Sequence, residues 1–306
     1  MRILVTGGTG AIGRELCTRL AKKHQVASFS NTPNPELEKA GIKQIPGDVT
    51  NSQDCLKILA FKPDVIYHLA AELNELSPNL WKVNVEGTRN VLAAARKAGV
   101  KRFLHISTAS VLGSARGKPL IEEDPYQPRT AYERSKAAGE KLVIESSLPY
   151  TILRPSLLIT PNVYWRQIFE AARKHYPVIG KGDNNWHCVY LDDVLDALLL
   201  ALKPAAENKV YNIAGPDAKT YYQTYQLICK VLGIEMTHKH VPKWLVNAAC
   251  LVHETKCRLT GKKPNVTLMR TSVLRLTENR LISIEKAKRE LGYKPKVTTE
   301  EAIRKT

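Results

Sequence analysis

The chain has 306 residues and a formal net charge of +17, from 46 Lys and Arg residues against 29 Asp and Glu residues. That length suits one large α/β domain, or a nucleotide-binding domain with a smaller lobe, and no apolar run reaches the roughly twenty residues that span a bilayer. The six cysteines are scattered without CxxC pairs, which argues against a metal site or a disulfide framework and predicts buried, inert thiols.

The first predicted elements are a strand, a glycine turn and a helix. The apolar residues 3–5 lead into residues 6–13, TGGTGAIG, after which apolar residues recur on one helix face. Gly7 permits a tight turn with positive φ, Gly10 admits a pyrophosphate, and Gly13 lets the helix pack on the strand. Since the free N–H groups of that helix face the turn, the pattern predicts dinucleotide binding. Because the chain opens on a core strand, no cleaved signal peptide is expected, and the prediction is a cytoplasmic protein.

The second predicted strand spans residues 25–29, and the residue type at its end discriminates between NAD and NADP. An acid at this point would bind the adenosine ribose hydroxyls and favour NAD, whereas an arginine would pair with the extra phosphate of NADP. The chain has neither. Ser30 and Asn31 can donate to a phosphate or bond a hydroxyl, so both NAD and NADP remain open as the cofactor.

Two further strands end in residues of interest. A short strand around residues 43–45 leads to Asp48, which either meets the adenine amino group or caps the helix expected to start at Asn51. The buried strand in residues 64–71 ends in small residues, where a backbone can run beside the cofactor. His68, inside that strand, is interpreted as a core histidine.

A long helix is predicted at residues 81–98, with Gly99 as its C-cap, followed by a strand at 101–106 that leads to Ser107 and Thr108. Strands that alternate with helices in this way imply right-handed crossovers and a Rossmann-type, doubly wound parallel sheet of the α/β class. Ligands of such sheets bind at the carboxyl ends of the strands. The glycine turn and Thr108 both fall there.

The pattern changes after a further strand at residues 150–153. We therefore expect a Rossmann domain at residues 1–160, with residues 185–215 completing the sheet, and an apolar helix that begins near Val189. Residues 161–184 and 216–306 then form a smaller, mostly helical substrate lobe.

Three side chains predict the chemistry. Tyr132 and Lys136 have the i, i+4 spacing of one helix face, and their place downstream of a glycine turn favours a catalytic pair over a surface pair. A neighbouring ammonium, together with an oxidised nicotinamide, lowers the pKa of a tyrosine, so Tyr132 can be a general acid or base while Lys136 also holds the nicotinamide ribose. Thr108 can bond the same substrate oxygen, or else local backbone. Together they predict hydride transfer at a secondary alcohol or ketone.

Taken in order, these motifs resemble the extended short-chain dehydrogenase/reductase superfamily, in its NAD-dependent epimerase/dehydratase group, over nearly the whole chain. The resemblance implies that Thr108, Tyr132 and Lys136 are catalytic and that Asn84 supports the site. It places Asp48 at the adenine and Pro155 near the nicotinamide. The implied cofactor-binding residues are Gly7, Gly10, Ala11, Ile12, Gly13, Ser30, Asn31, Asp48, Val49, Leu69, Ala70, Ala71, Asn84, Tyr132, Lys136 and Pro155.

The resemblance leaves the reaction open. Residues 258–264 and 286–295 are similar to the dihydroflavonol-reductase and hydroxysteroid-dehydrogenase-like branch, and Ala109-Ser110 replaces the Asp-Glu pair of dehydratases. We expect an NAD(P)-dependent oxidoreductase or epimerase, which acts either as a net dehydrogenase or reductase or through one half of an epimerisation cycle. The alternatives are a UDP-glucose-type 4-epimerase with tightly held NAD and a non-catalytic NAD(P)-sensing or RNA-binding protein. The small-molecule substrate is either a larger apolar alcohol or ketone or a sugar nucleotide, whose diphosphate would be clamped by Arg154, Lys181, Arg270 and Arg280.

The positive charge leads to expectations about partners. Most basic residues after Lys256 have no aromatic neighbour on which bases could stack, so a solvated basic surface is favoured over nucleic-acid binding. Residues 244–252, with the basic positions that follow, including Lys262 and Lys263, can form an interfacial membrane helix. Packing on the substrate lobe or in a dimer is the favoured alternative. The resemblance implies a homodimer through the helices after Trp81 and around Tyr132.

Overall fold

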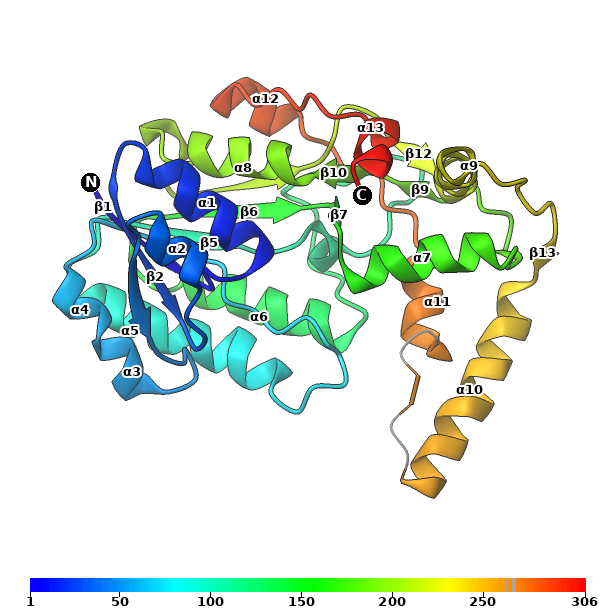
Figure 1. The fold of residues 1–306 in the computed structure, drawn as a ribbon, viewed down its shortest axis with the longest axis horizontal. Coiled ribbons are helices and arrows are strands. Elements are labelled where there is room, and N and C mark those ends of the chain that lie inside the picture. The colour runs from blue at the N-terminus through cyan, green and yellow to red at the C-terminus, as the bar shows by residue number, and fades with distance from the viewer. Residues whose placement is uncertain (262–263, 266–267) are drawn as a thin grey trace.

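The computed structural model describes residues 1–261, 264–265 and 268–306, and is built on one parallel seven-stranded sheet (Figure 1). Its strands are β1 (Arg2–Thr6), β2 (Gln25–Ser30), β3 (Lys43–Pro46), β4 (Val65–His68), β5 (Arg102–Ile106), β6 (Tyr150–Pro155) and β11 (Lys209–Ile213). The order is β11-β6-β5-β4-β1-β2-β3, so the direction of winding reverses between β1 and β4. This confirms the doubly wound α/β sheet and puts the ligand crevice of such folds beside the glycine turn after β1.

Helices cover both faces of the sheet (Figure 1). One face carries α1 (Ala11–Ala21), α8 (Leu191–Leu200) and α12 (Glu285–Leu291), with α2 (Pro35–Lys39) at the edge near β3. The other face carries α3 (Ser52–Leu56), α4 (Ile58–Phe61), α5 (Thr88–Lys97) and α6 (Ala131–Ile144). Short 3-10 turns, η2 (Ala109–Leu112) and η3 (Pro204–Ala206), connect these elements.

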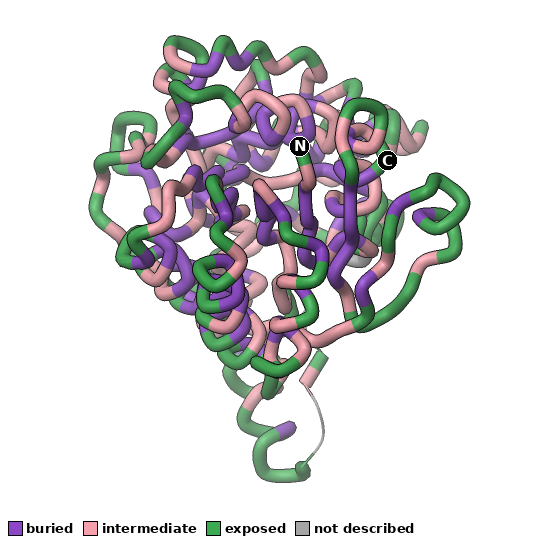
Figure 2. Tube along the Cα trace, turned by 90° about the vertical axis from the view of Figure 1, so that its left-hand side faces the viewer, coloured by how far each residue is buried: buried purple, intermediate pink, exposed green. Residues whose placement is uncertain are grey.

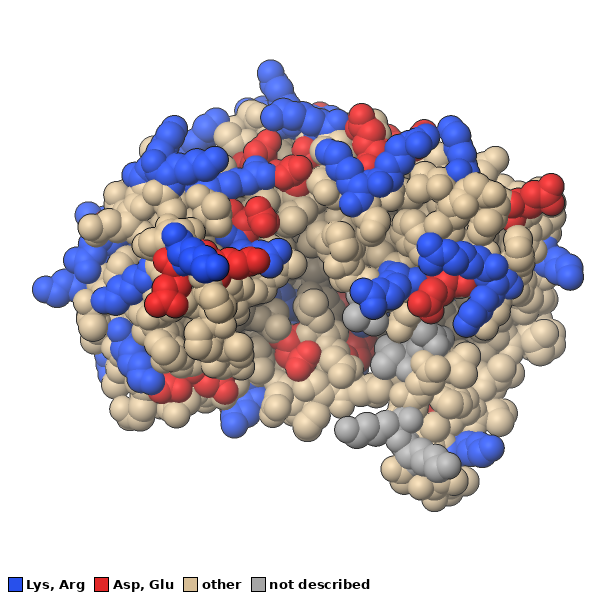
Figure 3. Space-filling view, viewed as in Figure 1, with Lys and Arg blue, Asp and Glu red and all other residues tan. Residues whose placement is uncertain are grey.

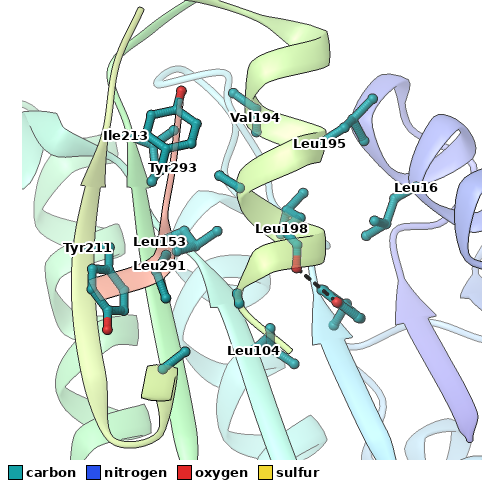
Figure 4. Packing of buried hydrophobic residues seen from close by; sticks show 14 of the residues in the cluster. Leu16, Leu104, Leu153, Val194, Leu195, Leu198, Tyr211, Ile213, Leu291 and Tyr293 are labelled. Atoms are coloured by element: carbon teal, nitrogen blue, oxygen red, sulfur yellow. Dashed lines mark hydrogen bonds between the residues drawn. The ribbon is translucent and has the colours of Figure 1, made fainter. Parts of the chain in front are cut away.

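The alternation of side chains along the strands builds two cores, one under each helical layer. In β1, Ile3 and Val5 belong to the core beneath α1 and α8, whereas Leu4 belongs to the opposite core. Figure 4 shows the leucines of α8 packed against the sheet. The Tyr67 hydroxyl donates to the Leu198 carbonyl at 3.0 Å. That bond satisfies a phenol which is otherwise enclosed by apolar side chains.

A third core lies beyond the carboxyl end of β6. It contains α7 (Val163–Arg173), α9 (Tyr221–Leu232) and α13 (Thr299–Arg304). Trp186 joins them, stacked on Tyr221 with ring centroids 4.8 Å apart and meeting Trp165 edge-on. The paired short strands of this region are β7 (Leu157–Ile159), β8 (Val178–Ile179), β9 (Asn185–Trp186), β10 (Cys188–Tyr190), β12 (Lys219–Thr220) and β13 (His240–Val241). From this region α10 (Lys243–Thr260) and α11 (Arg270–Thr277) extend away from the body (Figure 1).

Three local expectations need comment. Residues 188–190 form β10, which pairs with β7, so the helix expected from Val189 begins only at Leu191. Residues 81–98 are not one α-helix, because Lys82–Gly87 is a π-helix, η1, that continues into α5. All six cysteines are buried, as predicted.

On the face shown in Figure 3, the basic side chains are spread out rather than gathered. There, Lys and Arg side chains lie over both helical layers that cover the sheet, with acidic side chains among them. Within the described part of the chain, no helix combines the length and apolar character needed to cross a bilayer. Lys262 and Lys263 lie outside the described residues.

Candidate active site

The glycine turn between β1 and α1 is held by backbone packing that excludes side chains. Gly7 has φ +67°, and a Cβ there would lie 2.8 Å from the Ala70 nitrogen. A Cβ on Gly13 would lie 2.2 Å from the Gly7 carbonyl oxygen, so α1 is pressed directly onto the turn. Gly10 is the N-cap of α1 and has no side chain to cover the first amides of the helix. The turn therefore fits a pyrophosphate, which those amides can bind.

We expect Gly13→Ala to weaken NAD(P) binding at least tenfold and to cost about 1–3 kcal/mol of stability, because the new methyl group must displace the backbone of the turn. Thr18→Ala, on the exposed side of the same helix, is the matched control. Isothermal titration with NADH and NADPH measures the effect. Equal affinities of the two variants would show that the packing of Gly13 does not shape the site.

The end of β2 presents hydroxyl groups to the turn. Ser30 Oγ accepts from the Thr9 amide at 3.4 Å and lies 3.3 Å from Ser28 Oγ, while Asn31 is exposed beside it. These groups can bond either a ribose hydroxyl or a phosphate. The local geometry is therefore compatible with both dinucleotides.

Asp48 follows β3 as a half-buried turn residue. Its Oδ1 accepts from the Thr50 amide at 2.8 Å, whereas the capping of α3 that the sequence suggested for Asp48 is done by Asn51, which accepts from Gln53 N at 2.9 Å. Val49 is buried next to it. Asp48 thus keeps Oδ2 available at the carboxyl edge of the sheet.

The end of β4 lies against the glycine turn. The Ala70 amide donates to Thr6 Oγ1 at 3.3 Å, and Leu69, Ala70 and Ala71 are all half-buried. His68 lies 2.8 Å from Thr6 Oγ1 through Nδ1 and 3.0 Å from Thr88 Oγ1 through Nε2. Burial lowers its pKa to about 3. His68 is therefore a neutral core residue, as predicted.

Helix α6 brings Lys136 to the end of β5. A capping box starts the helix, since Glu133 N donates to Thr130 Oγ1 at 3.2 Å and Thr130 N donates to Glu133 Oε2 at 3.1 Å. One turn further on, Lys136 is 4% exposed and its Nζ donates to the Ile106 carbonyl at 2.6 Å. The predicted pair is thereby anchored to the strand that leads into Thr108.

Thr108 is the N-cap of η2. Its Oγ1 accepts from the Ser110 amide at 3.3 Å and donates to Ser110 Oγ at 3.2 Å. The local turn bonding weighed for Thr108 is thus present, and the hydroxyl remains half-buried at the strand end. Pro155 closes β6 on the neighbouring strand and is buried.

Burial has the largest effect on the pKa of Tyr132. Burial raises its pKa to about 12, and the charges that oppose this are Arg275 and Arg280 rather than Lys136. The lowering expected from Lys136 together with an oxidised nicotinamide stays a prediction for the cofactor-bound protein. Burial also lowers the pKa of Lys136 to about 8. Tyr132 is therefore neutral at ordinary pH.

Asn84 connects the site to the loop after β4. It lies in η1, where Nδ2 donates to Ser135 Oγ at 2.9 Å and to the Glu72 carbonyl at 3.0 Å, and Oδ1 accepts from the Glu72 amide at 2.9 Å. A π-helical turn in a longer helix is frequent at functional sites. The amide of Asn84 here fixes α6 next to Tyr132.

Comparison with known proteins decides the family. The model of the NAD dependent epimerase/dehydratase family matches residues 3–214. The chain belongs to this family. Because members of this family are NAD(P)-dependent enzymes, the chain is an NAD(P)-dependent enzyme.

Relatives of this epimerase/dehydratase family member span its whole length. The 2-alkyl-3-oxoalkanoate reductase of Stenotrophomonas maltophilia is 30% identical, over 100% of this chain and 98% of the reductase. The 3-beta-hydroxysteroid dehydrogenase of Mycolicibacterium neoaurum is 29% identical, over 99% of this chain and 89% of the relative. The UDP-glucose 4-epimerase of Thermotoga maritima shares the fold, with a TM-score of 0.77 at 24% identity, over 100% of this chain and 97% of the epimerase.

The sequence suggested Arg280 of this family member only as part of a diphosphate clamp and did not predict the contacts that it makes. It lies after α11 and bonds Ser110 Oγ, while its Nη2 lies 2.8 Å from Glu278 Oε2 and 3.4 Å from Glu133 Oε1. Arg280 therefore joins the C-terminal region to the segments that carry Thr108 and Tyr132.

The arginines suggested as a diphosphate clamp are paired with glutamates. Arg154 is 3% exposed and paired with Glu140 at 2.8 Å, so the suggested clamp role is wrong for it. Arg270 pairs with Glu254 at 2.9 Å, and Arg280 is paired as described above. Lys181, the fourth member of the set, is exposed.

Proposed function

We propose that the chain is a reductase or dehydrogenase that transfers hydride between a nicotinamide dinucleotide and a secondary alcohol or ketone on a largely apolar substrate. The observation that carries this proposal is the anchoring of Lys136 against the end of β5, with Tyr132 one turn before it and Thr108 just beyond the strand. The names of the two relatives, a 3-oxo acid reductase and a 3-hydroxysteroid dehydrogenase, support the reaction class.

When bound, the cofactor supplies or accepts the hydride. In the direction of reduction, Tyr132 gives its phenolic proton to the carbonyl oxygen as hydride adds to the carbonyl carbon, so the product is an alcohol and the tyrosine regains a proton from solvent. Thr108 donates its hydroxyl to the same oxygen. Lys136 holds the dinucleotide ribose and stabilises the transient phenolate.

The charges around Tyr132 support a substrate without a diphosphate. Arg275 is paired with Glu75 at 2.6 Å, and Arg280 is paired with two glutamates. Tyr164 of α7 faces the same two arginines, and its pKa is raised to about 12 by burial. A diphosphate would have to displace these ion pairs, whereas an apolar ketone would leave them intact.

The test starts with the nucleotide content of the purified protein. Denaturation is expected to release less than stoichiometric nucleotide, and the native protein is expected to bind free NADH or NADPH and to reduce long-chain 3-oxo acids or 3-oxosteroids. Stoichiometric, non-exchanging NAD together with conversion of UDP-glucose would establish the epimerase instead. Salt-sensitive RNA binding without turnover of any alcohol or ketone would establish the non-catalytic alternative.

The activity is expected to fall as the pH rises through about 8. Lys136 loses its charge there because burial lowers its pKa to about 8, and a neutral amine no longer stabilises the phenolate. The measurement is kcat/KM for reduction between neutral and alkaline pH. The guanidinium of the Lys136→Arg variant keeps its charge, so the fall in kcat/KM at this pH is expected to vanish. If kcat/KM still falls at this pH in the variant, another group is responsible for the fall.

We also infer a cytoplasmic homodimer that pairs α5 and α6, as the family resemblance implies. The exposed side of these helices is mainly basic, with Arg89, Arg96, Lys97, Arg134 and Lys141. Because like charges would face each other, the dimer fraction in sedimentation velocity is expected to rise with salt. A monomer at every salt concentration would contradict this interface.

A further inference from the structure

Helix α10 carries a row of large apolar side chains that face solvent. Leu259 is 82% exposed, Trp244 is 71% exposed and Val252 is 69% exposed, and Leu245 and Leu251 are each 47% exposed. Single exposed apolar residues are ordinary, but these five lie on one helix. Figure 3 shows this extending part of the molecule as mostly uncharged surface, with few basic side chains beside it.

The five side chains form one stripe, which we call the α10 stripe: Trp244, Leu245, Leu251, Val252 and Leu259. At 3.6 residues per turn they fall within an arc of about 120°, and the exposed Ala248 and Thr255 fill the spaces between them. Lys256 and Arg258 follow at either margin of that arc, roughly 20° beyond it. Both basic residues are exposed. The stripe is thus apolar along its middle and cationic along both edges.

The opposite side of α10 is already occupied within the chain. Cys250 and Cys257 are buried there, and the helix packs against α11. Glu254, the one acidic residue in α10, is paired with Arg270 at 2.9 Å. The α10 stripe therefore points away from the fold, and the packing on the lobe that the sequence favoured accounts for only one side of the helix.

We propose that the α10 stripe lies on the surface of an anionic lipid bilayer. The apolar side chains enter the boundary between headgroups and acyl chains, and Lys256 and Arg258 contact lipid phosphates on either side. Three features favour this occupant over a second copy of the chain. The edges of the stripe are cationic, the protein carries a net charge of +17, and α10 extends beyond the body so that a flat surface can reach it (Figure 1). If two α10 stripes paired symmetrically, their basic edges would face each other and repel.

Flotation of the full-length protein with vesicles tests the proposal. The vesicles are phosphatidylcholine alone, or phosphatidylcholine with an equal part of phosphatidylglycerol. Binding is expected to the anionic vesicles and to weaken at high salt. Trp244→Ser/Leu251→Ser/Leu259→Ser is expected to abolish it. Lys256→Gln/Arg258→Gln is expected to weaken it about thirtyfold, since each basic residue at an anionic surface contributes about a factor of five.

The control is Lys22→Gln/Lys23→Gln, which removes the same charge from exposed positions after α1. It is expected to change binding less than twofold, and circular dichroism checks that every variant is folded. The proposal is overturned if the wild type does not float with anionic vesicles, if both charge pairs weaken binding equally, or if the triple variant still binds. It is also overturned if the triple substitution converts a dimer into a monomer and vesicles are not bound, which would make the stripe an interface between copies.

Discussion

Tyr132→Phe is expected to lower kcat/KM for ketone reduction about a thousandfold while the thermal midpoint stays within about 2 °C of the wild type. The substitution keeps the ring that packs at the start of α6 and removes only the hydroxyl that carries the proton. Dinucleotide affinity, measured by titration with NADPH and NADH, is expected to change less than threefold. The loss should therefore appear in kcat rather than in cofactor binding.

Tyr176→Phe is the matched control, since Tyr176 is 56% exposed and lies in the third core region after α7. The pH profile adds a second check. Burial raises the pKa of Tyr132 to about 12, so the proton donor remains protonated throughout the neutral range and reduction should show no loss from Tyr132 below that pH. Full turnover by Tyr132→Phe would remove Tyr132 from the mechanism.

The features that could be predicted from the sequence are those that depend on local residue patterns. The strand ends at Thr6, His68 and Ile106, and the glycine turn that follows the first of them, are specified by short apolar runs and by glycine spacing. Parallel connection then brings these ends together, because each crossover must return to the same edge of the sheet. The family and its cofactor class followed from that order of motifs.

Features that depend on tertiary packing were not predictable. The spacing of Tyr132 and Lys136 gave their proximity, but only the fold shows that burial controls both pKa values. The role of Arg280 requires a residue far along the chain to reach Ser110, which no local pattern indicates. The helix of α10 was foreseeable from its residues, whereas the exposure of its apolar stripe depends on which side packs on α11.

The contacts of Arg280 connect distant parts of the chain. The same guanidinium bonds the turn after Thr108 and approaches Glu133, whose carboxylate accepts from the Thr130 amide in the capping box of the helix that carries Tyr132. Arg280 therefore links the turn after Thr108 to the start of α6.

Glu140→Ala is expected to destabilise the fold by about 3–5 kcal/mol, the cost of leaving a buried charge without its partner. Arg154 is 3% exposed and Glu140 is fully buried, and the guanidinium donates to both carboxylate oxygens, with Nε to Oε1 at 3.1 Å and Nη2 to Oε2 at 2.8 Å. The Tyr126 hydroxyl donates to the same carboxylate at 2.8 Å and would also lose its acceptor.

Urea unfolding measures the free energy of unfolding of each variant. The control Lys288→Ala breaks an exposed pair with Glu285 and is expected to cost less than about 1 kcal/mol. The double variant Glu140→Leu/Arg154→Met is expected to recover most of the loss, because apolar side chains of similar volume need no charge partner. A loss of less than about 1 kcal/mol in Glu140→Ala would mean that water reaches Arg154 and that the pair does not fasten α6 to β6.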